Sequence, residues 1–96
     1  MPRSEKAIVA DIVKYLRGEG WWVLKTHGSA FQRAGIPDLI AIRDSKVLWL
    51  EVKRPGKQPT KLQARTIDKL IDVGACVDVV YSVDDVRDFA GAVQSG

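Results

Sequence analysis

The chain has 96 residues, of which 46% are hydrophobic and 28% charged, and its net charge is +3. This length suits one domain with a modest core, and the composition is that of an ordinary globular protein. No stretch resembles a signal peptide or a membrane span, and a single cysteine excludes an intrachain disulfide framework. A cytoplasmic protein is therefore expected, and its mildly basic charge is compatible with nucleic acid.

The first predicted element is a helix that Ser4 caps and that runs to about Arg17. Glu5 falls on or beside the apolar stripe of this helix. It is open to two interpretations, a first-turn acid favoured by the helix dipole or a carboxylate that belongs to a functional site. The residues of the apolar stripe are Ile8, Ile12, Tyr15 and Leu16.

Residues 21–26 predict a strand that begins with two adjacent tryptophans, Trp21 and Trp22. Neighbouring strand residues point to opposite faces, so one indole must pack elsewhere, under a helix or against a partner subunit. The loop that follows contains His27, interpreted as a surface or packing residue, and Arg33, which either contacts phosphate or is simply solvated. No second histidine or cysteine has zinc-site spacing, so zinc is not expected.

Residues 39–42 and 47–52 predict two strands joined by the polar loop 43–46, as in a β-hairpin. A turn centred on residues 44 and 45 places Asp38 directly opposite Glu51. The second strand is apolar on both faces, so it should lie centrally in its sheet. The same register pairs Ile40 with Trp49 and Ile42 with Val47.

The predicted pairing brings two carboxylates together, because opposed residues have β-carbons roughly 4.5–5.5 Å apart. Like charges at that distance repel, and a hard divalent cation between them would compensate. Lys53 follows Glu51 by two residues and therefore points to the same face. The alternative is that Asp38 only opens a strand and that Glu51 and Lys53 form a solvated strip. Acids at the end of a central strand are costly without a role, which favours a functional site.

Asp38 followed by Glu51-Val52-Lys53 resembles the PD-(D/E)XK nuclease signature. The string Gly35-Ile36-Pro37-Asp38-Leu39 is similar to the VRR-NUC branch, the virus-type replication and repair nucleases, and the resemblance runs from about Glu5 to Tyr81. It implies a single α/β domain over residues 1–96. The implied architecture is a restriction-endonuclease-like mixed sheet flanked by helices in the order αβββαβα. Periodicity alone would give only an α/β or α+β domain.

The resemblance implies an active site that uses Mg²⁺ or Mn²⁺. Asp38, Glu51 and the backbone carbonyl of Val52 would hold the cation, and Lys53 would orient or activate the nucleophile. Glu5 matches an acidic residue on the first helix of the family and would assist, directly or through water.

A basic loop follows Lys53, and it is interpreted either as solvated surface or as a site for DNA phosphates. Thr60 to Gln63 predict a capping box that opens a helix. Gln63 is therefore either a cap or, as the resemblance implies, an active-site residue. The expected phosphate contacts are Arg33, Arg54, Lys57 and Lys61, and the expected buried stripe of the helix is Ile67, Leu70 and Ile71.

Residues 76–81 predict a further strand, in which Cys76 is expected to be a buried structural thiol. A last helix is expected to be capped near residues 82–85. It is interpreted as structural or as a dimer contact. Its apolar residues at helical spacing are Val86, Phe89, Ala90 and Val93.

The resemblance implies a metal-dependent DNA endonuclease, structure-specific in the manner of Holliday junction resolvases, in replication, repair or recombination. Its expected partners are branched or duplex DNA and a second copy of the chain, with no membrane. Its expected place is the cytoplasm of a bacterium, or of a host in the case of a viral or phage protein. Two alternatives stay open, a non-catalytic DNA-binding or assembly module with a nuclease fold and a sequence-specific restriction-type endonuclease.

Overall fold

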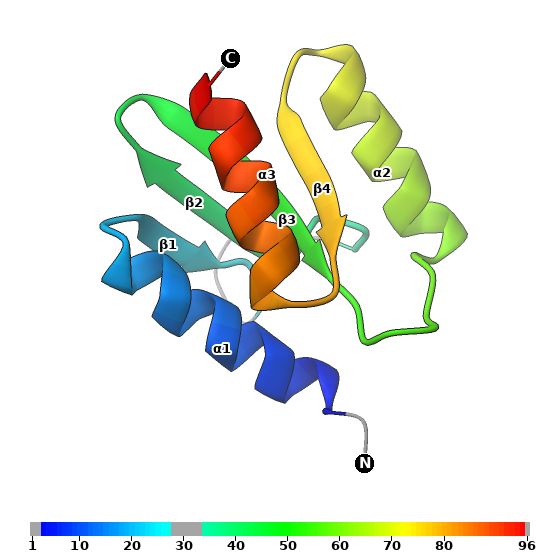
Figure 1. Ribbon diagram of the computed structural model, residues 1–96. Helices are drawn as coiled ribbons and strands as arrows, with labels where there is room; N and C mark the ends of the chain where they lie inside the picture. The colour runs from blue at the N-terminus through cyan, green and yellow to red at the C-terminus, as the bar shows by residue number, and fades with distance from the viewer. Residues whose placement is uncertain (1–2, 28–33, 96) are drawn as a thin grey trace.

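The computed structural model describes residues 3–27 and 34–95, and Figure 1 shows its arrangement. Helices α1 and α3 lie together across one face of a four-stranded sheet, and α2 lies beside β4 (Figure 1). The elements, in chain order, are α1 (Glu5–Gly18), β1 (Trp22–Lys25), β2 (Leu39–Arg43), β3 (Lys46–Val52), α2 (Lys61–Asp72), β4 (Cys76–Val80) and α3 (Val83–Ser95). The predicted order αβββαβα is confirmed.

The sheet is mixed, with strand order β1-β2-β3-β4. Strands β1, β2 and β3 are antiparallel neighbours, while β4 pairs in parallel with β3 and is reached through the crossover that contains α2. Strand β3 therefore lies between two other strands, as its apolar faces predict. No helix in the described part of the chain is long and apolar enough to cross a membrane.

The β2–β3 hairpin has the predicted register, in which Ile40 pairs with Trp49 and Ile42 with Val47. Its loop consists of Asp44 and Ser45, whose φ angles are 50° and 66°. Two consecutive residues with positive φ characterise a tight turn whose twist matches that of the flanking strands. A short turn of this kind fixes the register of everything that follows along both strands.

The core lies between the sheet and the two helices on its covered face. Ser4 caps α1, because its Oγ accepts the Ala7 N–H at 3.1 Å. Of the predicted stripe on α1, Tyr15 is only half-buried. The buried members of the core are Ile8, Ile12, Val13, Leu16, Trp21, Val23, Leu39, Ala41, Leu48, Leu50, Val52, Val80, Val86 and Ala90. Helix α3 contributes to this core, which supports the structural interpretation of its apolar residues.

The two adjacent tryptophans separate as the strand period predicts. Trp21 is 4% exposed and Trp22 is 59% exposed. The Arg43 guanidinium lies over the Trp21 ring at 4.6 Å from its centroid and donates a hydrogen bond to the Glu19 carbonyl. The stacked guanidinium covers an indole that already belongs to the core, and Trp22 is left on the other face of the sheet.

Two predictions about burial are wrong. No residue of α2 is buried: Ile67 and Leu70 are half-buried, and Ile71 is 51% exposed. The reason is that α2 packs against β4 at the edge of the sheet and has a partner on only part of its apolar side. Cys76 is exposed instead of buried, because it is the first residue of that same edge strand.

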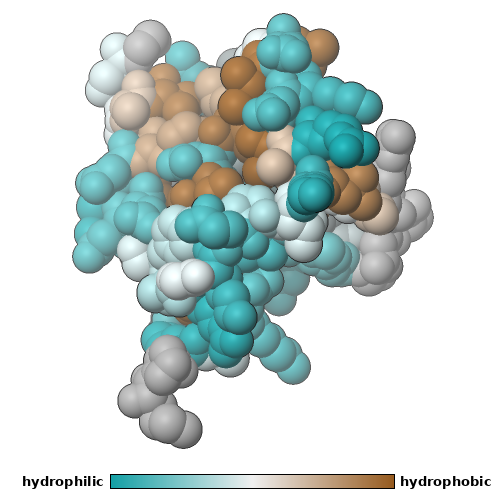
Figure 2. Space-filling view, turned by 90° about the vertical axis from the view of Figure 1, so that its right-hand side faces the viewer, coloured by the Kyte–Doolittle hydropathy of each residue, from teal (hydrophilic) through white to brown (hydrophobic). Residues whose placement is uncertain are grey.

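The sheet face opposite α1 and α3 carries an apolar row that we call the open face. It consists of Trp22, Ile42 and Val47, which are paired across β1, β2 and β3 and are 59%, 39% and 37% exposed. Figure 2, which looks onto the side of the molecule formed by α2, shows further apolar surface interrupted by polar groups. Leu62, Ile71 and Val73 are the large apolar residues of this region that are exposed.

Candidate active site

Asp38 lies immediately before β2, one step beyond the Leu39–Leu50 pair, so the hairpin register places it opposite Glu51. Asp38 is only 8% exposed. The Val52 N–H donates to Asp38 Oδ2 at 2.8 Å. This bond ties the carboxylate to the end of β3, on the strand that carries the second predicted acid.

Glu51 is 1% exposed. Within the described residues, neither of its carboxylate oxygens has a hydrogen-bond donor. The pKa of Glu51 is raised to about 8, first by burial and then by the negative charge of Asp38, while Lys53 opposes the rise. Burial is therefore a larger cause of the raised pKa than the pairing of the two acids.

Lys53 lies beside Glu51, as the two-residue spacing predicts. Its Nζ is 3.7 Å from Glu51 Oε2, which is an ion pair longer than a hydrogen bond. The side chain is 11% exposed. The Lys53 N–H donates to the Val80 carbonyl at 3.0 Å, so the backbone at this point is anchored to the end of β4.

Glu5 comes to the same end of the sheet from the first turn of α1. It is half-buried, and its negative charge contributes to the raised pKa of Glu51. A pocket of about 270 Å³ opens here between α1 and the loop after β3. Its lining residues are Ser4, Glu5, Lys53, Arg54, Lys57 and Gln58. Two segments that are distant in sequence, the start of α1 and the stretch after β3, therefore bring an acid and several cations together.

Three predicted site residues remain to be placed, namely Lys61, Arg33 and Gln63. Lys61 is exposed at the start of α2, and Arg33 lies outside the described residues. Gln63 forms the predicted capping box: its Oε1 accepts the Thr60 N–H at 2.9 Å, and its N–H donates to Thr60 Oγ1 at 3.2 Å. The cap accounts for the Gln63 side chain, and its active-site role stays a prediction.

His27 is a member of the site that the sequence analysis did not assign. Its Nε2 lies 2.5 Å from Asp38 Oδ1. His27 follows β1, which pairs with β2, but the connection between these two strands is long. No short turn sets their register, so the sequence carried no signal that these two side chains would meet.

Two facing carboxylates, Asp38 and Glu51, rather than a cage of side chains, could hold a cation. Among residues 3–27 and 34–95, no three His, Cys, Asp or Glu side chains are placed to hold a metal ion together. Glu51 nevertheless presents a buried carboxylate without hydrogen-bond donors, next to the negative Asp38. Oxygen ligands in this number fit Mg²⁺ or Mn²⁺, which keep several waters.

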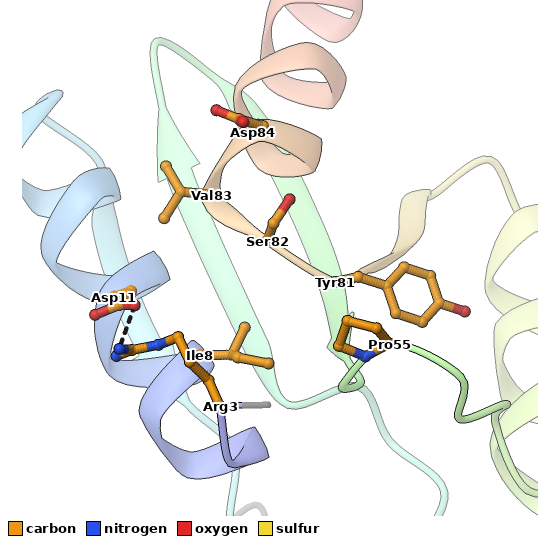
Figure 3. A pocket seen from close by; sticks show the side chains of 8 residues that line it. All are labelled: Arg3, Ile8, Asp11, Pro55, Tyr81, Ser82, Val83 and Asp84. Carbon is orange, nitrogen blue, oxygen red and sulfur yellow. Dashed lines mark ion pairs between the residues drawn. The ribbon is translucent and has the colours of Figure 1, made fainter. Parts of the chain in front are cut away.

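A second hollow of about 360 Å³ lies nearby, between the start of α1 and the turn that connects β4 to α3 (Figure 3). Pro55 and Tyr81 form one side of it, and the ion pair of Arg3 with Asp11 at 2.8 Å lies on the other. Neither Asp38 nor Glu51 lines this hollow. Glu5 and Lys53 do not line it either, so, unlike the 270 Å³ pocket, this hollow contains no predicted site residue.

Proteins similar to this chain include nucleases. The family model described as "Archaeal holliday junction resolvase (hjc)" matches residues 2–76. "Putative nuclease p44" of Acyrthosiphon pisum secondary endosymbiont phage 1 is 37% identical over 80 residues, 77% of this chain and 83% of that protein. A solved structure named "VRR_NUC domain" has 26% identity and a TM-score of 0.77, covering 91% of this chain and 94% of its own. Another, "VRR_NUC domain protein", has 21% identity and a TM-score of 0.80, covering 99% and 91%.

The mixed sheet, its helices and the structural neighbours define a small α/β nuclease domain of the restriction-endonuclease-like class. Within that class, the chain belongs to the archaeal Holliday junction resolvase family and has the VRR-NUC fold. The family resemblance predicted from the sequence is thereby confirmed.

Proposed function

We propose that the protein is a metal-dependent endonuclease that hydrolyses phosphodiester bonds in branched DNA during replication, repair or recombination. The observation that carries this proposal is the buried Glu51 carboxylate, without donors among the described residues, beside Asp38 and Lys53. An arrangement that strains the free protein in this way is typical of a site built for a cation.

Asp38, Glu51 and the backbone carbonyl of Val52 would hold Mg²⁺ or Mn²⁺. The bound cation would supply a more acidic water and stabilise negative charge on the phosphate. Lys53, held against Glu51, would orient the attacking water and offset the developing charge. Glu5 lines the 270 Å³ pocket together with Lys53, and from there it would assist through water.

DNA would approach across the basic rim of this pocket. Arg54 and Lys57 are exposed and line it, and Lys61 is exposed at the start of the next helix. Cations that flank a hydrolytic site position the phosphate backbone without reading sequence. We include Arg33 in this set on the basis of its sequence position. Gln63 is retained as a further active-site candidate.

A homodimer would suit branched DNA, because a two-fold axis places two active sites for paired cuts. The open face supports this proposal, since contiguous apolar surface of this kind commonly marks a protein interface. The phage relative fits an enzyme that acts in the cytoplasm of a bacterial host.

The proposal is tested with purified wild type, Asp38→Ala and Glu51→Ala on linear duplex, flap and four-way-junction DNA, each with Mg²⁺ or Mn²⁺. Wild type should cut the junction best. Each variant should lose at least about 100-fold in rate while keeping its fold, since even indirect partners of a metal commonly contribute 10–100-fold. Asp72→Ala, an exposed carboxylate at the end of α2, is the matched control and should cut normally.

Three results would contradict the proposal in different ways. Junction binding without cutting would identify a non-catalytic module. One preferred cleavage sequence in linear duplex would identify a restriction-type enzyme. Undiminished cutting by Asp38→Ala or Glu51→Ala would remove these acids from the mechanism.

A further inference from the structure

The Asp38 carboxylate is held at both oxygens. Oδ2 accepts the Val52 N–H at 2.8 Å, and Oδ1 lies 2.5 Å from His27 Nε2. An ionised carboxylate only accepts hydrogen bonds, so the imidazole must carry its hydrogen on Nε2 and donate it. The His27 side chain is 58% exposed and that of Asp38 is 10% exposed. The imidazole therefore closes the solvent side of a mostly buried acid.

The backbone around His27 is fixed to the segment that carries Asp38. The Thr26 N–H donates to the Asp38 carbonyl at 2.9 Å. The Thr26 hydroxyl donates to the Pro37 carbonyl at 2.7 Å and lies 3.2 Å from the Asp38 carbonyl, and Thr26 itself is 1% exposed. The residue before His27 is therefore anchored to the segment that carries Asp38, which keeps the imidazole within reach of the Asp38 carboxylate.

We propose that His27 is a positioning residue that fixes the orientation of the Asp38 carboxylate for cation binding. This inference rests on the proposed function and deepens it. The terminal torsion of an aspartate is broad, so bonds at both oxygens are needed to define it. Each oxygen has two lone pairs, and one hydrogen bond leaves Oδ1 free to accept a cation as well. Hydrogen bonds that orient metal-binding carboxylates typically contribute ~10–100-fold in affinity or activity.

Other roles for His27 fit the geometry less well. For a general-base role only Nδ1 is left, since Nε2 faces Asp38 Oδ1. Loss of such a base would lower the cleavage rate at every Mn²⁺ concentration, which the test below distinguishes from weakened cation binding. As a metal ligand it would need to join both acids, and the described residues contain no such group of three. A plain surface histidine would not approach one buried carboxylate oxygen while the other is bound by the backbone.

The test measures Mn²⁺ binding to the purified, DNA-free protein by calorimetry. His27→Ala removes the donor, whereas His27→Gln keeps an N–H near the position of Nε2. The Ala variant should bind Mn²⁺ ~10–100-fold more weakly, and the Gln variant should recover most of this loss. In junction cleavage the Ala variant should lose rate at low Mn²⁺, recover it at high Mn²⁺ and keep an unchanged KM for DNA.

A spectroscopic measurement reports the contact without any metal. His27 is the only histidine in the chain, so its imidazole ¹⁵N signals need no assignment. Wild type should show a proton held on Nε2, and Asp38→Ala should change these signals while Asp72→Ala does not. This measurement tests the contact between His27 and Asp38 without using His27→Ala, so it stays informative even if that variant folds poorly.

The outcomes separate the two proposals. If wild type binds Mn²⁺ and cuts while His27→Ala binds equally well, the positioning role is wrong and the nuclease proposal stands. If His27→Gln folds but binds as weakly as the Ala variant, or if Asp38→Ala leaves the imidazole signals unchanged, the positioning role is also wrong. If wild type neither binds Mn²⁺ nor cuts, both the proposed function and the positioning role of His27 are wrong.

Discussion

Glu51 is the residue whose surroundings differ most from those that an ionised carboxylate prefers. It is 1% exposed, faces the charge of Asp38 and has no hydrogen-bond donor among the described residues. The 3.7 Å contact to Lys53 offsets this only in part. In the metal-free protein, a proton on Glu51 relieves the repulsion. At the residue scale, the ionised, metal-free site is therefore destabilising.

The sign of the resulting pH dependence follows from linkage. The pKa of Glu51 is about 8 in the folded protein and 4.5 for the unperturbed side chain, so the folded state holds an extra proton between these limits. The stability of the metal-free protein should therefore fall as pH rises from 4.5 towards 8, by at most about 1.4 kcal/mol per pH unit from this group. Below this window Glu51 is protonated in both the folded and the unfolded state, so it adds nothing to the pH dependence of stability.

Glu51→Gln tests this prediction, because the amide cannot ionise. Urea unfolding of both metal-free proteins between about pH 5 and 9 should show a flatter profile for the variant and a higher stability than wild type at the alkaline end. Mn²⁺ should stabilise wild type and not Glu51→Gln. Parallel profiles for the two proteins would mean that Glu51 does not titrate in this range.

At the scale of elements, Gly35 joins the acid-bearing segment to α2. Its φ is +86°, and a β-carbon there would lie 2.8 Å from Leu62 Cγ and from Thr66 Oγ1. The Leu62 carbonyl would be 3.2 Å away, and a backbone atom cannot move aside cheaply. Both the conformation and the space therefore exclude a side chain. This close approach adds to the packing of α2 against β4.

We expect Gly35→Ala to destabilise the protein by about 2–3 kcal/mol, because strain at positive φ adds to overpacking against α2. Cleavage should fall as well, since Asp38 lies three residues further on. Chemical unfolding and junction cleavage measure the two effects. Gly56→Ala is the matched control: it has a similar φ of +88° but no atom within 4 Å of the added carbon, so it should show only the conformational cost.

The elements also show what could be predicted from the sequence. The hairpin register and the Thr60–Gln63 cap were predictable because each depends on residues close together in the chain. The contact of His27 with Asp38 was not, because a long loop separates the two strands. Burial of α2 was wrongly predicted since periodicity shows which side of a helix is apolar but not how much of that side finds a partner.

At the scale of the whole molecule, the two faces of the sheet differ in how far helices cover them. One face is covered by α1 and α3, while Trp22, Ile42 and Val47 remain 59%, 39% and 37% exposed on the other. The strands that carry this row also lead to His27, Asp38 and the Glu51–Lys53 segment. A partner on the open face would therefore be attached directly to the strands that position the active site.

Ile42→Lys tests the proposal that a second copy covers this face. In the isolated chain Ile42 is 39% exposed, so a lysine there should leave the fold intact, with its ammonium in water. In a dimer the same charge would be buried without a partner and should prevent association.

Sedimentation should find wild type as a dimer and the variant as a monomer, and the variant should nick junctions singly. Ala92→Lys, exposed on α3 at the covered face, should remain dimeric. A monomeric wild type, or a dimeric Ile42→Lys, would exclude the open face as the interface.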